Sequence, residues 1–201
     1  MTRRAQQRSE HLRQAIADEA ARIMLEQGVK DFLLAKRKAA ERLGVNDNTI
    51  LPKNAEIETA LQLRQRLFNA QHDNQLSSLR HSALRLMQMF QEFQPRLVGS
   101  VLSGTATAHS DINVHIFADH AERISLKLSE RGIAHDHGEK KLRYDSDRYI
   151  SYPSFKFIAG RHAVEIVVLP EDGIRQSPLS PVDSRPMQRA SIAELETLMR
   201  Q

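Results

Sequence analysis

The residues whose types and spacing could best carry out chemistry lie between positions 97 and 117, in the stretch LVGSVLSGTATAHSDINVHIF. An apolar run ends in Gly99 and Ser100, a loop of small residues follows, and Asp111 opens a second apolar run. A glycine followed by a small hydroxyl residue lets a phosphate approach backbone N–H groups closely. A carboxylate at the start of a strand is a suitable ligand for a divalent cation. The stretch therefore predicts a site that holds a phosphorylated ligand together with a metal ion.

Alternation along residues 112–117 predicts a strand with two chemically different faces. We expect the aliphatic face to point into the core, and it carries Ile112, Val114 and Ile116. The opposite face carries Asp111, Asn113, His115 and Phe117. Asp111 and Asn113 are expected to lie roughly 7 Å apart between their Cα atoms, so both side chains can approach one ion.

A further carboxylate, Glu165, is the only charged residue in the run AVEIVVLP. A carboxylate buried in such a run is costly unless a cation or a metal ion pairs with it. The alternative is that Glu165 lies on the solvent face of an alternating strand. The sequence leaves both interpretations open.

Together these residues resemble the signature of the nucleotidyltransferase superfamily related to DNA polymerase beta. The signature is an apolar residue, Gly-Ser, about ten residues, and then an acidic residue that opens a strand; Gly99-Ser100 and Ser110-Asp111-Ile112-Asn113-Val114 occupy these positions. The chain looks most similar to the minimal nucleotidyltransferase domains of bacteria. Glu165 matches the third carboxylate of the family, which lies on a later strand. The resemblance covers about residues 76–170.

The resemblance implies a metal-dependent transferase that moves a nucleotidyl group from a nucleoside triphosphate to a hydroxyl of an acceptor. In the family, two divalent ions (Mg²⁺ or Mn²⁺) bind the triphosphate and activate the attacking hydroxyl. It implies catalytic roles for Asp111 and Glu165. The implied metal ligands are Asp111, Asn113 and Glu165. The implied nucleotide contacts are Gly99, Ser100, Ser110 and Asn113.

Asn113 departs from the family pattern, because it stands where a second aspartate is expected. An amide is uncharged and offers one good oxygen ligand, so the two-ion site should be weakened strongly. Three alternatives follow: Asp111 and Glu165 hold one ion together with the phosphates of the nucleotide, His115 or Asp119 compensates for the missing carboxylate, or the site has lost its chemistry. In the third case the chain would be a nucleotide-sensing regulator, or one that binds a protein or a nucleic acid. Whether the protein is an enzyme is therefore open.

The helices and strands that must position these residues can be predicted from the spacing of apolar residues and from residues that start or stop a helix. Helices are predicted over 9–27, 31–43, 55–68, 74–93 and 121–130, with a short final helix whose Ser191 and Glu194 have capping-box spacing. Strands are predicted over 97–102 and 112–117, and residues 149–170 read as a hairpin that turns at 159–162. The polar stretch 134–148 is predicted to be a loop or a ragged edge strand.

This order predicts an α+β fold, in which a mostly helical N-terminal half precedes a small mixed sheet of nucleotidyltransferase type. We expect a helical region over 1–72, a nucleotidyltransferase-like domain over 73–170, and an extended tail with a short C-terminal helix over 171–201. The acceptor, which could be a protein or a nucleic acid, the nucleotide preference and the oligomeric state do not follow from the sequence.

Composition narrows the class of protein further. The absence of cysteine excludes disulfides and thiolate metal sites. No apolar run is long enough for a membrane span, and the first residues lack a signal-peptide core, so we expect a cytoplasmic protein with no membrane partner. The net charge of +4 permits nucleic-acid contact. The basic residues of 36–42 either grip a phosphate backbone or form a solvated helix face, and those of 140–148 either line the cleft or form a solvated loop.

Overall fold

The computed structural model describes residues 3–45, 47, 50–67, 69–107 and 109–200. The chain forms two compact units. The helical unit comprises residues 1–73 with the short segments 107–109 and 181–183. The sheet unit comprises residues 74–106, 110–180 and 184–201. Each unit is described by itself.

The helical unit contains α1 (Arg3–Gln27), α2 (Phe32–Arg42) and α3 (Asn54–Leu67). Alanine dominates its core, and this small side chain lets helices approach closely. The buried residues are Ile16, Ala17, Ala20, Ala21, Ile23, Met24, Ala35, Ala39, Ala40, Ile57, Ala60 and Leu61. Their spacing on each helix is the three- and four-residue period that predicted the helices.

Local signals set the ends of these helices. Gly28 has a φ of +67° and ends α1, as predicted. The carboxylate of Asp31 accepts a hydrogen bond from the N–H of Leu34 at 2.7 Å and caps α2. The sequence NDNTILPKN over 46–54, with Pro52, predicts a turn between the second and third helices, and it lies partly outside the described residues. In the basic run of α2, the guanidinium of Arg42 pairs with Glu19 at 2.9 Å, whereas Arg37 is exposed. Nucleic-acid contact by this run stays a prediction.

The sheet unit is built on a mixed sheet of five strands, in the order β1-β2-β5-β4-β3. The strands are β1 (Arg96–Val98), β2 (Ile112–Phe117), β3 (His135–Arg143), β4 (Tyr149–Ala159) and β5 (His162–Leu169). Strands β2 and β5 are parallel and all other pairs are antiparallel. The predicted hairpin over 149–170 is confirmed as β4 and β5. The predicted α+β fold is confirmed.

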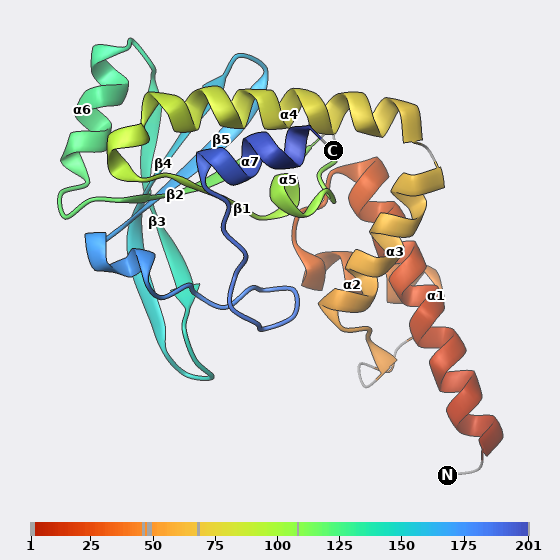
Figure 1. The fold of residues 1–201 in the computed structure, drawn as a ribbon. Coiled ribbons are helices and arrows are strands. Elements are labelled where there is room, and N and C mark those ends of the chain that lie inside the picture. The colour runs from red at the N-terminus through yellow and green to blue at the C-terminus, as the bar shows by residue number, and fades with distance from the viewer. Residues whose placement is uncertain (1–2, 46, 48–49, 68, 108, 201) are drawn as a thin grey trace. The chain divides into compact units, whose positions relative to one another are not determined.

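One face of the sheet is covered by helices α4 (Asn69–Met89), α6 (Glu122–Glu130) and α7 (Ile192–Met199), as Figure 1 shows. The core on this face takes in the aliphatic side of β2, as predicted, with its neighbours on β5 and β4. Central members are Leu79, Leu86, Phe90, Ile112, Val114, Ile116, Ile124, Leu128, Phe155, Val164, Ile166 and Leu195. The segment before α7 also joins the sheet, because Leu97 and Ala190 exchange backbone hydrogen bonds of 2.8 and 2.9 Å.

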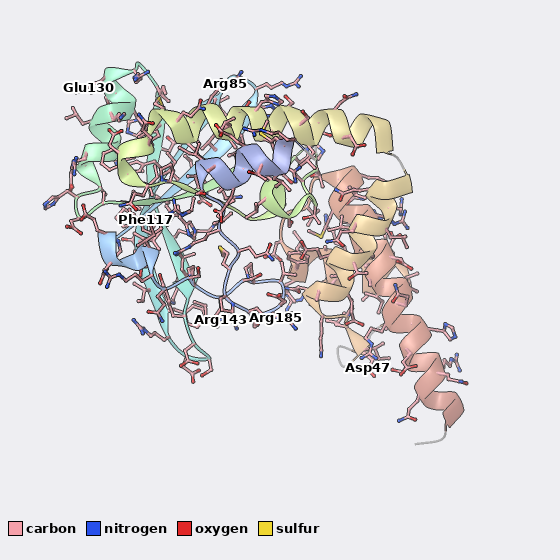
Figure 2. All side chains as sticks on the ribbon, in the orientation of Figure 1. Asp47, Arg85, Phe117, Glu130, Arg143 and Arg185 are labelled. Carbon is pink, nitrogen blue, oxygen red and sulfur yellow. The ribbon has the colours of Figure 1, made fainter. Side chains whose placement is uncertain are left out.

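The second face of the sheet is covered only in part. A smaller cluster forms there from Phe117, Leu142, Val167 and Leu169, with Tyr144, Tyr152 and Ile174 packed against it. The 3-10 helix η3 (Glu171–Ile174) contributes the last of these. Side chains therefore fill both faces of the sheet near Phe117, which Figure 2 labels. The sequence placed Asp111, Asn113, His115 and Phe117 together on a polar face, but the structure buries the last two.

Two sequence predictions need correction, and a third is decided between its alternatives. Residues 101–102 lie in the short helix α5 (Ser100–Ser103), because Gly99 turns the chain away from the sheet. Helix α4 begins at Asn69 and ends at Met89, followed by the 3-10 helix η2 (Gln91–Phe93). The polar residues 69–74 contain neither glycine nor proline and so do not interrupt a helix. Of the two alternatives predicted for 134–148, a loop or an edge strand, the edge strand is observed over 135–143.

Two further observations complete the fold. The capping box predicted at Ser191 and Glu194 is present: the hydroxyl accepts from the N–H of Glu194, and the carboxylate accepts from the N–H of Ser191. Within the described part of the chain, no helix combines the length and the apolar character needed to cross a lipid bilayer.

Candidate functional site

A row of polar side chains crosses the sheet at the start of β2. In the register of the strands, Asn113 lies opposite Val98 on one side and Glu165 on the other, and Glu165 lies opposite Lys156. Lys156 in turn lies opposite Asp136 on the edge strand. Residues directly opposite in a sheet point to the same face. The structure thus brings the predicted Asn113 and Glu165 side by side, on the face away from α4 and α6.

Glu165 is buried and held by two lysines. One oxygen of its carboxylate lies 2.7 Å from Nζ of Lys140, and the other lies 3.5 Å from Nζ of Lys156. The Glu165 side chain is 8% exposed. Of the two interpretations left open by the sequence, the buried and ion-paired one is observed. The lysine side chains are largely exposed, at 45% and 64%, so water shares in balancing the charge.

Asp111 lies near Glu165, along a shallow hollow of about 160 Å³. The hollow is also lined by Lys156, by Asp136 and by residues 157–158 and 163–164. The two carboxylates predicted to be catalytic therefore border one space. That space is small for a whole nucleotide, but its lining residue Lys156 is largely exposed, so a larger ligand can extend beyond it.

The Gly-Ser turn adjoins Asn113. Gly99 has φ +75° and ψ −156°, a conformation that only glycine adopts readily. A Cβ at this position would lie 3.5 Å from Nδ2 of Asn113, so the backbone approaches the amide closely. That amide donates to the backbone carbonyl of Asp111 at 3.1 Å, which leaves its oxygen to meet a ligand. Ser100 begins α5 with a partly exposed side chain, and Ser110 directly precedes Asp111.

The two residues expected to compensate for Asn113 are not placed to do so. His115 is 2% exposed, and burial, then Arg189 and Lys140, lower its pKa to about 3. Its Nδ1 atom is buried without a hydrogen-bond partner. Asp119 lies six residues beyond Asn113, roughly 20 Å along the strand direction, and accepts a hydrogen bond from the N–H of Glu171 at 3.4 Å. The structure thus corrects this expectation for both residues.

The residues present suit one divalent ion better than two. Asp111 and Glu165 border the hollow, and two carboxylates with phosphate oxygens and water form a usual Mg²⁺ shell. Across the described ranges, no group of three or more histidine, aspartate and glutamate side chains has the arrangement of a metal site. The ammonium groups of Lys140 and Lys156 already occupy the space beside Glu165 where a second cation would sit.

Sequence reasoning did not single out Lys156 or Asp136. Lys156 stands between the buried Phe155 and Phe157. This alternation could have predicted that Lys156 points to the opposite face of the sheet from the two phenylalanines. Lys140 was considered as a residue that could line the cleft, but not as a partner of Glu165. Scanned against protein families and curated proteins, the chain gives no significant match.

Proposed function

We propose that the sheet unit is a nucleotidyltransferase-like domain that binds a nucleoside triphosphate with a divalent ion and transfers its nucleotidyl group to a hydroxyl of an acceptor. The observation that carries the proposal is the convergence of Asp111 and Glu165 on one hollow, beside Asn113 and the Gly99 turn. The resemblance in sequence required these residues to meet, although 54 positions separate the two acids in the chain.

Each residue of the site has a distinct role in this proposal. The Gly99 turn and the first N–H groups of α5 would bind phosphate oxygens, because the first N–H groups of a helix lack acceptors within it. Asp111 would be the principal metal ligand and Asn113 a neutral contact to the nucleotide. The carboxylate of Glu165 would orient the attacking hydroxyl and accept its proton. Lys140 and Lys156 hold that carboxylate in place.

One ion at Asp111 and Glu165 would supply positive charge to the triphosphate and polarise the phosphorus that is attacked. The chain's own cations add to this charge: Lys156 lines the hollow, and the half-exposed Lys140 pairs with Glu165, which also lines it. Both can bind phosphate oxygens as point charges when a nucleotide arrives.

A specific observation also favours a second candidate, a regulatory protein that binds a nucleotide, a protein or a nucleic acid but catalyses nothing. The reaction would need the carboxylate of Glu165, but both of its oxygens are already paired with lysines. An ammonium group in the place of a metal ion stabilises a bound triphosphate but cannot take a hydroxyl oxygen as a ligand. In this candidate the lysines replace the second ion for binding only.

The experiment is a calorimetric titration of the whole chain with ATP, GTP, CTP and UTP, each with Mg²⁺, with Mn²⁺ and with a chelator. We expect one nucleotide to bind in a metal-dependent way and Asp111→Asn to weaken that binding at least tenfold. Asp119→Asn is the matched control, because it removes the same charge from an exposed position outside the site. Binding of no nucleotide, or equal binding by both variants, would refute the proposed site.

The two candidates separate in a transfer assay. The chain is incubated with the bound nucleotide labelled at its α-phosphate, first alone and then with candidate protein and RNA acceptors. Release of pyrophosphate together with label on an acceptor supports the transferase. Metal-dependent binding without pyrophosphate release, under every acceptor condition, supports the regulatory protein.

A further inference from the structure

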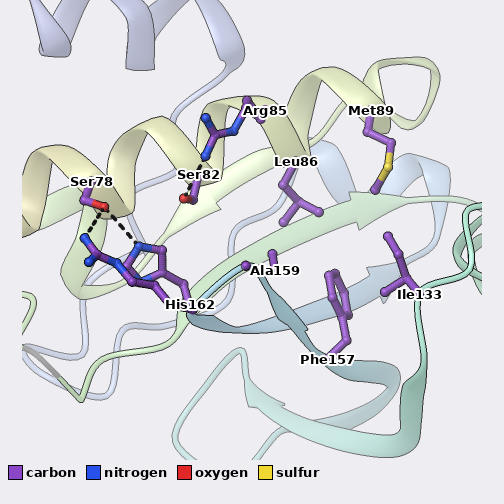
Figure 3. A pocket seen from close by; sticks show the side chains of 11 residues that line it. Ser78, Ser82, Arg85, Leu86, Met89, Ile133, Phe157, Ala159 and His162 are labelled. Carbon is purple, nitrogen blue, oxygen red and sulfur yellow. Dashed lines mark hydrogen bonds between the residues drawn. The ribbon is translucent and has the colours of Figure 1, made fainter.

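A second hollow lies in the sheet unit between α4 and the turn of the β4–β5 hairpin, with a volume of about 440 Å³ (Figure 3). Its volume is within the usual range for small-molecule sites. We call it the α4 hollow. It is lined by Ser78, Ser82, Arg85, Leu86, Met89, Ile133, Phe157, Ala159, Gly160, Arg161 and His162. It lies on the helix-covered side of the sheet, whereas Glu165 points to the other face.

The polar end of the α4 hollow is built from α4 and the hairpin turn. The guanidinium of Arg161 donates to the hydroxyl of Ser78 at 3.0 Å, and the same hydroxyl meets Nε2 of His162 at 3.1 Å. One turn further along α4, Arg85 donates to Ser82 at 3.4 Å. In Figure 3, Ser78, Ser82 and His162 lie together at this end.

This end carries positive charge without a counter-charge. Among the residues the structure describes, neither Arg85 nor Arg161 has a carboxylate within ion-pair distance, and no acidic residue lines the hollow. The pKa of His162 is lowered by burial and further by Arg161 and Arg85, so both guanidinium charges reach the imidazole. Two uncompensated arginines beside hydroxyl groups are suited to a phosphate or carboxylate group.

The other end of the hollow is apolar. Figure 3 shows Leu86, Met89, Ile133 and Phe157 grouped there, away from Ser78 and His162. Leu86 and Phe157 are buried in the core, while Met89 and Ile133 are only partly buried and pack against it. A flexible methionine at such a wall adapts to different apolar shapes. The hollow thus has one positively charged end and one apolar end.

We propose that the α4 hollow binds a small amphiphilic anion, with its phosphate or carboxylate group at Arg85 and Arg161 and its apolar body against Met89, Ile133 and Phe157. This site goes beyond the proposed transferase function and uses none of the residues that carry a role in it, although Phe157 lines both hollows. Both requirements must be met together, since neither a bare anion nor a neutral apolar molecule fills both ends.

The test is a titration of the whole chain, followed by calorimetry and by amide NMR shifts. The probes are octyl phosphate, octanoate, 1-octanol and inorganic phosphate, all below their aggregation limits. We expect saturable binding of octyl phosphate or octanoate, at least tenfold tighter than binding of 1-octanol or inorganic phosphate. The two amphiphiles compared with each other distinguish a phosphate from a carboxylate head group.

Variants locate the binding. Arg85→Gln with Arg161→Gln should weaken the binding at least tenfold. Ala159→Glu should abolish it, because it places a negative charge in the lining of the hollow that repels an anionic ligand. Arg175→Gln is the matched control, because Arg175 is an exposed arginine that follows η3 and does not line the hollow. This variant should leave the affinity unchanged. Circular dichroism verifies that each variant folds.

The proposal would be overturned by no saturable binding of either amphiphile at millimolar concentration, by binding of 1-octanol as tight as that of octyl phosphate, or by equal weakening in the control variant. Full binding in folded Arg85→Gln/Arg161→Gln would do the same. Unchanged amphiphile binding in Asp111→Asn is expected, and it would show that the site is independent of the proposed nucleotide site.

Discussion

The ammonium of Lys140, on the edge strand β3, lies 2.7 Å from a carboxylate oxygen of Glu165, two strands away on β5. The lysine reaches across β4, whose own Lys156 meets the same carboxylate from the side. A buried acid that would serve a metal ion in a transferase is thereby neutralised by the chain itself. Whether a cation can compete with these lysines decides between the two candidate functions.

Replacing both lysines of this pair tests that competition. Lys140→Met with Lys156→Met leaves the carboxylate of Glu165 buried without a partner, so stability should fall by about 1–3 kcal/mol. Divalent ions should then restore stability in proportion to their concentration, because they bind only the folded site. Thermal unfolding with and without Mg²⁺ or Mn²⁺ measures both effects.

The control for the double variant is Lys141→Met, a neighbouring lysine whose ammonium lies over the ring of Tyr149 instead. It should show no metal-dependent stabilisation. If the double variant also gains nothing from divalent ions, Glu165 is not a metal ligand in this protein.

Restoring the missing carboxylate is the second prediction. Asn113→Asp places a charge directly beside Glu165 and next to Asp111, so divalent-ion affinity should rise, by tenfold or more. Without metal the extra repulsion should lower stability. A weak enzyme should gain turnover in the pyrophosphate-release assay, whereas a regulatory protein should gain metal binding only. Asn113→Ala serves as the control, because it removes the amide without adding charge.

The Gly99 turn gives the third prediction. Gly99→Ala forces a Cβ into a backbone region that non-glycine residues avoid, at a cost of about 1–3 kcal/mol. The new methyl group would make only an ordinary van der Waals contact with the amide of Asn113, so the strain would be relieved by a shift of the turn itself. Nucleotide affinity should therefore fall together with stability in a denaturant titration. Gly132→Ala, at a glycine with positive φ and nothing within 4 Å, should cost stability alone.

The buried His115 gives the fourth prediction, a dependence of stability on pH. Its pKa is about 3 in the folded chain, and burial is the main cause, with Arg189 and Lys140 adding to it. The unfolded chain takes up this proton near pH 6.5, while the folded chain does not. Stability should therefore fall as the pH drops below 6.5, by about 2 kcal/mol at pH 5, until the pH passes the folded value.

Denaturant titrations between pH 7.5 and 5 measure this slope. His115→Leu removes the titrating group, and with it a buried Nδ1 that lacks a partner, so the variant should show a flatter profile. His120→Gln, at an exposed position, should keep the wild-type slope. An unchanged slope in His115→Leu would show that another group controls the acid response.

Elements whose signals are local in the chain could be predicted from the sequence. Strand 112–117 was predicted with the bounds it has, because its alternation is a local property of six residues. The hairpin, the helix end at Gly28 and the capping box at Ser191 rest on equally local chemistry. Residues 101–102 were assigned to a strand because Val and Leu suit either element, and only the turn at Gly99 places them in α5.

The sequence by itself determined which residues of this protein could carry chemistry, their order, and the core face of β2, since types and periods are written in the chain. The tertiary structure alone decided that Asn113 and Glu165 lie directly opposite each other on paired strands, that two lysines hold Glu165, and that His115 is buried instead of lining the site. Strand register and burial arise from contacts between residues far apart in the chain. No local pattern specifies which strands pair, and one residue of slip would turn every side chain to the other face.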